Sequence, residues 1–278
     1  MKLFRHGKQG SERAGAVDGK GILRDLSLLV PDLTPEWLSA EKMQALQAIN
    51  LEKMPEVPKG ARIGVPLAGI PQFVAIGLNY KKHAEEAGLE LPKEPPVFTK
   101  ALTSLGGAND DITMPDDSVA MDWEIELGFI IGTTARKVAV ASAMSHVAGY
   151  CLANDVSERD WQIKRGTQWG KGKSFDGFGP IGPWLVTADE MKDPHSVPLK
   201  LSVNGQVRQQ SNTADMIFPV AEIVSYLSQF MTLLPGDVVI TGTPSGVGLG
   251  MKPPQFLKRG DVMTLDGGAL GTQTQKVV

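Results

Sequence analysis

Short runs of β-forming residues, separated by turn residues, fill the chain from Phe73 to its end. The runs are FVAIGLN, MDWEIELGFIIG, VAGYCLAND, GPWLVT, LKLSVNG, DVVITGTP and DVMTL. Gly, Pro, Asn and Asp interrupt them, as expected for strands joined by tight turns. Only PVAEIVSYLSQF (219–230) clearly repeats its apolar residues at intervals of three and four, the spacing of an amphipathic helix. Many strands and few helices predict an α+β, mostly β fold and argue against a doubly wound parallel sheet.

The first seventy residues have a different texture. They contain a strand-like KLFRHG, a turn-rich GSERAGAVDGKG and a mixed ILRDLSLLV. Thr34 is placed to cap a helix that Pro35 begins. The segment PEVPKGARIGVPLAG, rich in Pro and Gly, is typical of a linker. Because 278 residues exceed one average domain, we expect a small β-rich N-terminal domain at 1–70 and a catalytic domain at 71–278.

Composition argues against several classes of protein. The net charge is −3 and no Lys/Arg block forms a phosphate-binding stripe, so we expect no nucleic-acid partner. The apolar runs are too short to cross a bilayer and the opening residues lack the apolar core of a signal peptide, so we expect no membrane contact and a cytoplasmic location. The single cysteine, Cys151, excludes internal disulfides and multi-cysteine zinc sites. It lies in an apolar run without an activating base, which indicates a structural role.

Three carboxylates alternate with apolar residues in MDWEIELGF. On a strand, Asp122, Glu124 and Glu126 would share one face. An isolated pair of this kind is more often a solvated acidic strand than a site. Here the next predicted strand ends at Asp155, which adds a further acid. Oxygen ligands without cysteine or clustered histidine suit a hard divalent cation, so we predict Mg²⁺ or Mn²⁺ rather than zinc.

The sequence resembles the fumarylacetoacetate hydrolase family in five ordered blocks. They are IGLNYKKHAEE (76–86), MDWEIELGFIIG (121–132), GYCLANDVSERDWQ (149–162), GKSFDGFGPIGPW (172–184), and PGDVVITGTPSGVG (235–248) followed by FLKRGDV (256–262). The resemblance covers nearly all of the chain after residue 70. The opening MKLFRHG and the long N-terminal unit are also similar to family members acting on 2,4-diketo-3-deoxy sugar acids and to sequences labelled ureidoglycolate lyases.

The resemblance implies a fold, a metal site and an assembly. It implies a catalytic domain folded as a mixed β-sandwich roll, with Mg²⁺ or Mn²⁺ held by Glu124, Glu126 and Asp155. Asp122 then lies outside the set of direct ligands. Family members are commonly homodimers, so a homodimer is expected here too.

A second pair of residues points to proton transfer. Asn79 is placed to cap a short helix, YKKHAEEA, that Gly88 would end. His83 and Glu86 would then share one face of this helix. Taken alone, such a pair is more often on the surface. The resemblance implies instead that the pair activates a water. Because so short a helix is marginal by itself, we hypothesise that residues 79–90 form a lid ordered by metal and substrate.

Lys173 lies in the glycine-rich segment GKGKSFDGFGP. Flanking glycines allow the backbone to approach a ligand closely. The segment is not a nucleotide-binding phosphate loop, because Thr167 stands where the first glycine of that motif belongs. The resemblance implies that Lys173 binds substrate and offsets the charge of an enolate.

Three further residues are candidate substrate contacts. Thr243 offers a hydroxyl and nearby backbone amides for a carboxylate. The resemblance implies that Thr243 and Gln162 contact the substrate. Arg159 aligns as well, although an ion pair with Asp160 or another acid is an equally good interpretation.

These features together predict a metal-dependent hydrolase. It would cleave the C3–C4 bond of a 2,4-diketo acid (an acylpyruvate) into pyruvate and a carboxylic acid. Decarboxylation of an oxaloacetate-type β-keto acid, isomerisation of a 2-hydroxy-diene-dioate and a ureidoglycolate lyase-like reaction stay open, because the ligands do not separate them. A catalytically silent binding protein is disfavoured, because the sequence has all of Glu124, Glu126, Asp155, His83, Glu86 and Lys173.

Overall fold

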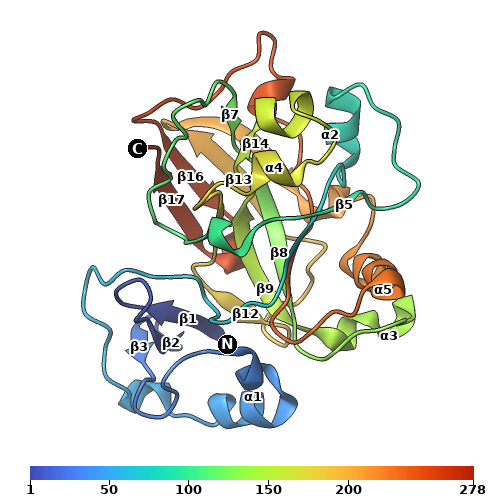
Figure 1. Ribbon diagram of the computed structural model, residues 1–278. Helices are drawn as coiled ribbons and strands as arrows, with labels where there is room; N and C mark the ends of the chain where they lie inside the picture. The colour runs from blue at the N-terminus through green and yellow to red at the C-terminus, as the bar shows by residue number, and fades with distance from the viewer.

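The computed structural model describes residues 1–278 and confirms an α+β fold made mostly of β-strands (Figure 1). The largest sheet has 11 strands. They are β1 (Lys2–His6), β2 (Arg13–Val17), β3 (Leu23–Asp25), β4 (Phe73–Ile76), β5 (Val97–Thr99), β6 (Leu105–Gly107), β8 (Ile125–Ile131), β9 (Val147–Asn154), β11 (Gly179–Ile181), β12 (Leu185–Thr187) and β15 (Val238–Ile240). Its main path runs β3-β2-β1-β12-β9-β8-β15-β4-β5.

Two smaller sheets complete the β structure. One pairs β7 (Met121–Asp122) with β10 (Ser157–Glu158). The other has the order β14-β13-β16-β17. Its strands are β13 (Pro198–Val203), β14 (Gln206–Asn212), β16 (Val262–Asp266) and β17 (Thr272–Lys276). In Figure 1 this sheet lies at the upper left, and the N-terminal strands β1–β3 lie at the bottom.

Helices are few and short. They are α1 (Ala40–Gln47), α2 (Lys81–Glu86), α3 (Val140–Ala143), α4 (Gly170–Lys173) and α5 (Val220–Phe230). The longest, α5, buries the apolar face that its spacing predicts. None of the helices combines the length and apolar character that crossing a bilayer requires.

The N-terminal strands extend the main sheet. β1 pairs antiparallel with β12, with Leu3 opposite Leu185. The apolar side chains of this part pack into a core of 19 buried residues that also takes in Phe73, Cys151 and Ile240. The division into two domains at residue 70 stays a prediction.

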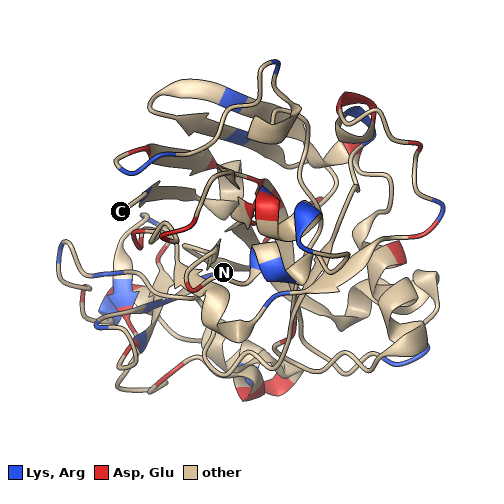
Figure 2. Cartoon of the chain, turned by 45° about the horizontal axis from the view of Figure 1, so that its top comes forward, with Lys and Arg blue, Asp and Glu red and all other residues tan.

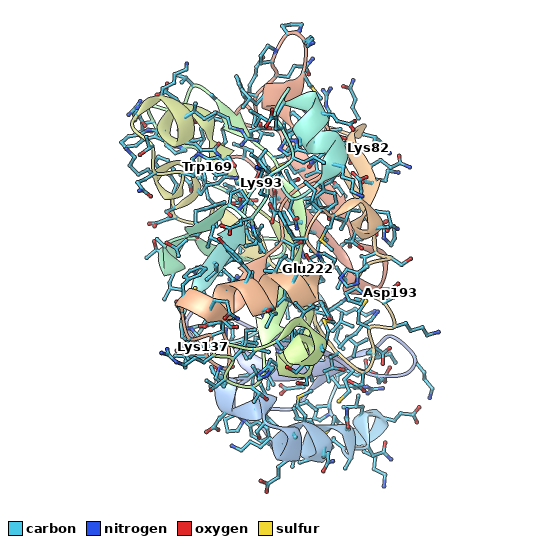
Figure 3. All side chains as sticks on the ribbon, turned by 90° about the vertical axis from the view of Figure 1, so that its right-hand side faces the viewer. Lys82, Lys93, Lys137, Trp169, Asp193 and Glu222 are labelled. Atoms are coloured by element: carbon cyan, nitrogen blue, oxygen red, sulfur yellow. The ribbon has the colours of Figure 1, made fainter.

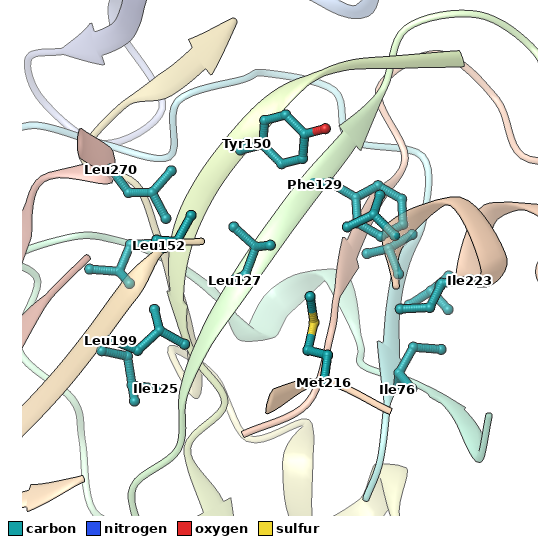
Figure 4. Close-up of a cluster of buried hydrophobic side chains, with 14 of the residues drawn as sticks. Ile76, Ile125, Leu127, Phe129, Tyr150, Leu152, Leu199, Met216, Ile223 and Leu270 are labelled. Carbon is teal, nitrogen blue, oxygen red and sulfur yellow. The ribbon is translucent and has the colours of Figure 1, made fainter. Parts of the chain in front are cut away.

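Strands β8 and β9 form the centre of the molecule. Seven paired positions join them antiparallel. Ile125, Leu127 and Phe129 of β8 point into the larger core of 36 residues, together with Tyr150 and Leu152 of β9 (Figure 4). Since β8 is buried along its whole length, its polar positions need partners inside the protein.

Two predicted helix caps are wrong. The Asn79 side chain does not cap α2, because its amide donates to the carbonyls of Thr241 (2.8 Å) and Phe218 (3.1 Å). Thr34 makes no capping hydrogen bond either, and the chain after it forms a 3₁₀ turn before Ser39 caps α1. Gly88 does end the α2 segment in a left-handed conformation (φ +66°).

Candidate active site

The pairing of β8 with β9 brings three carboxylates together. Ile125 pairs with Asn154, so Asp155 follows β9 directly beside Glu124, and its N–H donates to the Glu124 carbonyl (2.8 Å). Glu126 lies one strand repeat further along the same side. One oxygen from each of the three carboxylates lies within 4.8 Å of the others, and all three residues are buried. The structure thus brings Glu124, Glu126 and Asp155 together as predicted.

Three cationic side chains surround these acids. The Lys173 ammonium donates to Glu124 Oε2 (2.5 Å) and to Asp155 Oδ2 (2.6 Å). Lys100 donates to the other oxygen of Asp155, and Arg159 Nη2 lies 2.6 Å from Glu124 Oε1. Burial alone would raise the pKa of Glu124, but the charges of Arg159 and Lys173 outweigh it and lower that pKa to about 2. Glu124 is therefore held as a carboxylate.

Glu126 touches no cationic side chain. It accepts a hydrogen bond from the Gly242 N–H (2.7 Å). Burial raises the pKa of Glu126 well above its usual range, and the neighbouring charges of Asp155 and Glu124 raise it further. The charge of Lys173 and the Gly242 N–H offset only part of this effect, so an ionised Glu126 is incompletely compensated.

The donor set fits a hard divalent cation. It consists of carboxylate oxygens from Glu124, Glu126 and Asp155, with no cysteine or histidine among them. A cation at this place would also complete the partial compensation that Lys173 gives to Glu126.

Asp122 has a different task from its neighbours on the same segment. Its Oδ2 accepts from Arg159 Nε (2.8 Å), and its two oxygens accept from the backbone N–H groups of Gly248 (2.7 Å) and Leu249 (3.0 Å). The side chain therefore joins Arg159 to the loop at 246–250. Its exclusion from the ligand set agrees with these contacts.

Arg159 forms its ion pairs with Asp122 and Glu124 rather than with Asp160. Its Nη1 also donates to Gln162 Oε1 (2.9 Å). Asp160 instead accepts from Arg165 Nε (2.8 Å). The guanidinium thus fixes the side chain of Gln162 through its oxygen, and the N–H donors of the Gln162 amide remain available.

His83 and Glu86 are paired on α2. His83 Nδ1 lies 3.2 Å from Glu86 Oε2. Both Glu86 oxygens accept from the N–H of Gly246, at 3.0 and 3.1 Å. This second contact fixes the carboxylate, which in turn orients the imidazole. The other ring nitrogen, Nε2, is left without a hydrogen-bond partner in the protein.

Most of the predicted site residues line one cavity of about 270 Å³. Of the nine predicted site residues, eight line it: His83, Glu124, Glu126, Asp155, Arg159, Gln162, Lys173 and Thr243. Glu86 stands behind His83. The Thr243 hydroxyl donates to the Ile125 carbonyl (2.9 Å) and accepts from Gln209 Nε2 (2.8 Å). It is therefore engaged within the protein.

Several groups around this cavity belong to no sequence motif. Lys100 is buried against Asp155 although its segment, TKALTSL, carries no motif. Phe98 and Trp169 form part of the wall, and Gln209 bonds the backbone of Ile125 (3.0 Å) as well as Thr243. Figure 3 places Trp169 and Lys82 in the upper half of the molecule, above the helix that carries Glu222. Positive and negative side chains are otherwise mixed along the chain (Figure 2).

The chain is similar to known proteins over its whole length. Residues 72–278 match the family model "Fumarylacetoacetate (FAA) hydrolase C-terminal". A Burkholderia ambifaria protein, provisionally named a hydrolase, is 53% identical over 99% of this chain and 98% of its own length. The solved fumarylacetoacetate hydrolase of Exiguobacterium antarcticum is 35% identical with a TM-score of 0.86, and the alignment covers 100% of this chain and 99% of that one.

A solved 2-hydroxyhepta-2,4-diene-1,7-dioate isomerase from Mycobacterium marinum is 30% identical with a TM-score of 0.74, over 100% of this chain and 98% of the isomerase. The fold and the cavity therefore define an enzyme on a scaffold shared by hydrolases and isomerases. The chain belongs to the fumarylacetoacetate hydrolase family.

Proposed function

We propose that the protein is a divalent-metal-dependent hydrolase that cleaves the C3–C4 bond of a 2,4-diketo acid. The products would be pyruvate and a carboxylic acid. One observation carries the proposal: His83, which Glu86 orients from behind, lines the same cavity as the three carboxylates. A hydrolysis needs both a base for water and a site that accepts negative charge on the leaving half.

Glu124, Glu126 and Asp155 would hold Mg²⁺ or Mn²⁺. Such a cation, when bound, supplies Lewis-acid polarisation of the keto acid. The exchangeable waters that these ions keep leave room for a substrate.

His83 would act as the general base through Nε2. It takes a proton from water while the water oxygen forms a bond to C4 of the diketo acid. Glu86 keeps Nδ1 protonated and holds the ring, because its carboxylate is fixed by Gly246. As the C3–C4 bond breaks, its electron pair remains on C3 as the enolate of pyruvate, and C3 then takes a proton.

Lys173 would offset the charge of this enolate. An ammonium has three N–H donors, and Lys173 uses two on Glu124 and Asp155. The third is available for a substrate oxygen. Gln162 would contribute an amide donor, with Arg159 keeping its side chain in place. Thr243 would shape the pocket wall beside them.

Isomerisation of a 2-hydroxy-diene-dioate is the second candidate, because a solved relative carries that name. Decarboxylation of an oxaloacetate-type acid and a ureidoglycolate lyase-like reaction would use the same carboxylates. The His83–Glu86 pair favours hydrolysis, since decarboxylation needs no activated water.

A substrate panel separates these reactions. Acylpyruvates, oxaloacetate, a 2-hydroxy-diene-dioate and ureidoglycolate would each be mixed with the protein and Mg²⁺ or Mn²⁺, with EDTA as the control. We expect loss of the enol absorbance of an acylpyruvate together with pyruvate formation. Turnover of any of the other three substrates without pyruvate formation from an acylpyruvate would overturn the proposal. Sedimentation analysis of the same preparation would test the expected homodimer.

A further inference from the structure

The strand pairing on one edge of β8 stops before it reaches the proposed metal ligands. β15 pairs with this edge, and the last backbone contact is the N–H of Thr241, which donates to the Leu127 carbonyl (3.0 Å). The next residue, Gly242, has φ +92° and lines the cavity. Ile125 lies between two of the proposed ligands and beyond the end of this ladder, so no strand pairs with it on this side.

Two side chains bind Ile125 where the strand is missing. Gln209 Oε1 accepts from the Ile125 N–H (3.0 Å), and the Thr243 hydroxyl donates to the Ile125 carbonyl (2.9 Å). Gln209 Nε2 donates to Thr243 Oγ1 (2.8 Å), which closes a ring of hydrogen bonds, and also to the Pro244 carbonyl (2.8 Å). The oxygen and the nitrogen of this buried amide are thereby both engaged, and its partners permit only this orientation.

A β-bulge brings Gln209 to this position. The pairing of β14 with β13 skips Arg208, so the side chains on either side of it do not alternate as in a regular strand. Val207 is exposed, whereas Gln209 is fully buried. The bulge also lies against the loop that follows Pro244, because a Cβ added to Gly246 would stand 2.0 Å from the Arg208 carbonyl oxygen. The strand β14 therefore packs directly on the loop that Gln209 binds.

Gln209 contacts both segments that position Glu126. Ile125 directly precedes Glu126 in β8. On the other side, the N–H of Gly242 donates to Glu126 Oε2 (2.7 Å), and the next residue, Thr243, is bonded to Gln209. Since no cationic side chain touches Glu126, these backbone contacts are what hold its carboxylate. Groups that orient a metal ligand typically change metal affinity by about 10–100-fold when they are removed.

We propose that Gln209 is a positioning residue of the metal site. Its amide holds Glu126 where this carboxylate can bind a divalent cation together with Glu124 and Asp155. The inference rests on the proposed function for the presence of the cation, but it does not depend on which keto acid is the substrate. A purely structural amide would contribute to stability and leave metal affinity unchanged.

A binding experiment with Mn²⁺ tests the inference without turnover. The full chain is treated with EDTA, dialysed and titrated with Mn²⁺, and electron paramagnetic resonance measures the free ion. Gln209→Met keeps the length of the side chain and removes its hydrogen bonds. We expect the dissociation constant of Mn²⁺ to rise by about 10–100-fold in this variant. Circular dichroism at the same temperature would verify that the variant is folded.

Gln273→Met is the matched control. Gln273 is also fully buried and lies on β17 of the same small sheet. Its Nε2 donates to the carbonyls of Leu152 (2.9 Å) and Gly182 (2.8 Å), and its Oε1 accepts from Gln275 (2.9 Å). None of these partners belongs to β8 or to the loop 241–246, and Gln273 reaches the acids only through two further side chains. Both variants should be less stable, but only Gln209→Met should bind Mn²⁺ more weakly.

Thr243 provides a second test of the same ring, which applies even if Gln209→Met does not fold. Thr243→Val removes the hydroxyl at nearly constant shape, whereas Thr243→Ser keeps it. We expect weaker Mn²⁺ binding in Thr243→Val and affinity close to that of the unmodified protein in Thr243→Ser. No substrate is present in this titration, so the proposed contact of Thr243 with substrate does not affect the result.

The possible outcomes are distinguishable. Unchanged Mn²⁺ affinity in Gln209→Met, an equal loss in Gln273→Met, or equal affinities in the two Thr243 variants would overturn the inference and leave the proposed function intact. Absence of Mn²⁺ binding by the unmodified chain would overturn both. The expected loss of affinity in a protein that hydrolyses no acylpyruvate would support the inference and remove only the proposed reaction.

Discussion

Asp122 holds Arg159 through two contacts of 2.8 Å, at Nε and Nη2, in a place where neither side chain reaches solvent to any useful extent. Because Arg159 in turn contacts Glu124 and Gln162, this pair connects the acidic site to the loop at 246–250.

Asp122→Asn should lower the free energy of unfolding by about 3–5 kcal/mol, because one partner of a buried ion pair is removed. Urea denaturation would measure it. Asp160→Asn is the control, since it removes a partly exposed pair with Arg165 and should cost no more than about 1 kcal/mol. Equal losses of unfolding free energy in the two variants would show that the Asp122–Arg159 pair stabilises the protein no more than the Asp160–Arg165 pair does.

His83→Ala should reduce kcat for an acylpyruvate by ~10²–10⁴-fold, the usual contribution of a general base. Metal content, measured by elemental analysis, should stay the same, because His83 is not among the three carboxylates proposed as ligands. His146→Ala is the control, at a half-buried histidine whose Nδ1 lies 3.1 Å from the Thr133 carbonyl, and should leave kcat unchanged. Undiminished hydrolysis in His83→Ala would show that His83 is not the general base.

Mg²⁺ should stabilise the EDTA-treated protein by about 2.7 kcal/mol at a free concentration of 100 times its Kd. In Glu126→Gln this response should disappear. Without metal, the variant should be at least as stable as its parent, because it no longer buries a carboxylate that touches no cation. Thermal denaturation measures both effects, with the exposed Glu90→Gln as control. A full Mg²⁺ response in Glu126→Gln would argue against its role as a ligand.

Stability should fall between pH 7.5 and pH 5.5 through His6. Burial lowers the pKa of His6, and the nearby Asp25 carboxylate offsets only part of this effect. In the unfolded chain, histidine has a pKa of about 6.5, so below this pH His6 binds a proton in the unfolded state but not in the folded state. The free energy of unfolding therefore decreases as the pH falls towards the pKa of His6 in the folded state. Urea denaturation would show a smaller difference in unfolding free energy between the two pH values in His6→Gln than in the unmodified protein. If this difference in unfolding free energy is the same in His6→Gln, another group causes the loss of stability.

Hydrogen exchange should reveal whether residues 79–90 act as a lid. The helix α2 has only six residues, and Glu86 fastens it to Gly246. Its amides should exchange faster than those of β9 and should slow when Mg²⁺ and pyruvate are added together. Equal rates with and without these ligands would contradict the lid hypothesis.

Local patterns determined much of this protein from the sequence alone. The alternation of side chains along a strand has a period of two, so the sequence predicts Glu124 and Glu126 on one side of a single strand. In the structure this strand is interrupted at residues 123–124, and Glu124 lies just before β8, but the two carboxylates still come together. Periods of three and four identified α5, and the left-handed conformation of Gly88 ends α2 as predicted. Each of these properties depends on a few neighbouring residues.

Only the tertiary structure decided which distant residues meet. Lys100 joins Asp155 from 55 positions away, and Trp169 reaches Gly77 and Phe98, with no motif to announce either contact. The sequence predicts that Asn79 caps the helix beside it, but in the structure its amide donates hydrogen bonds to two carbonyls far along the chain. The sequence indicates Glu124 and Glu126 because their spacing is local, whereas Asp155 joins them through the pairing of β8 with β9. Their charge partners and the apolar wall come from segments far along the chain, which packing alone brings together.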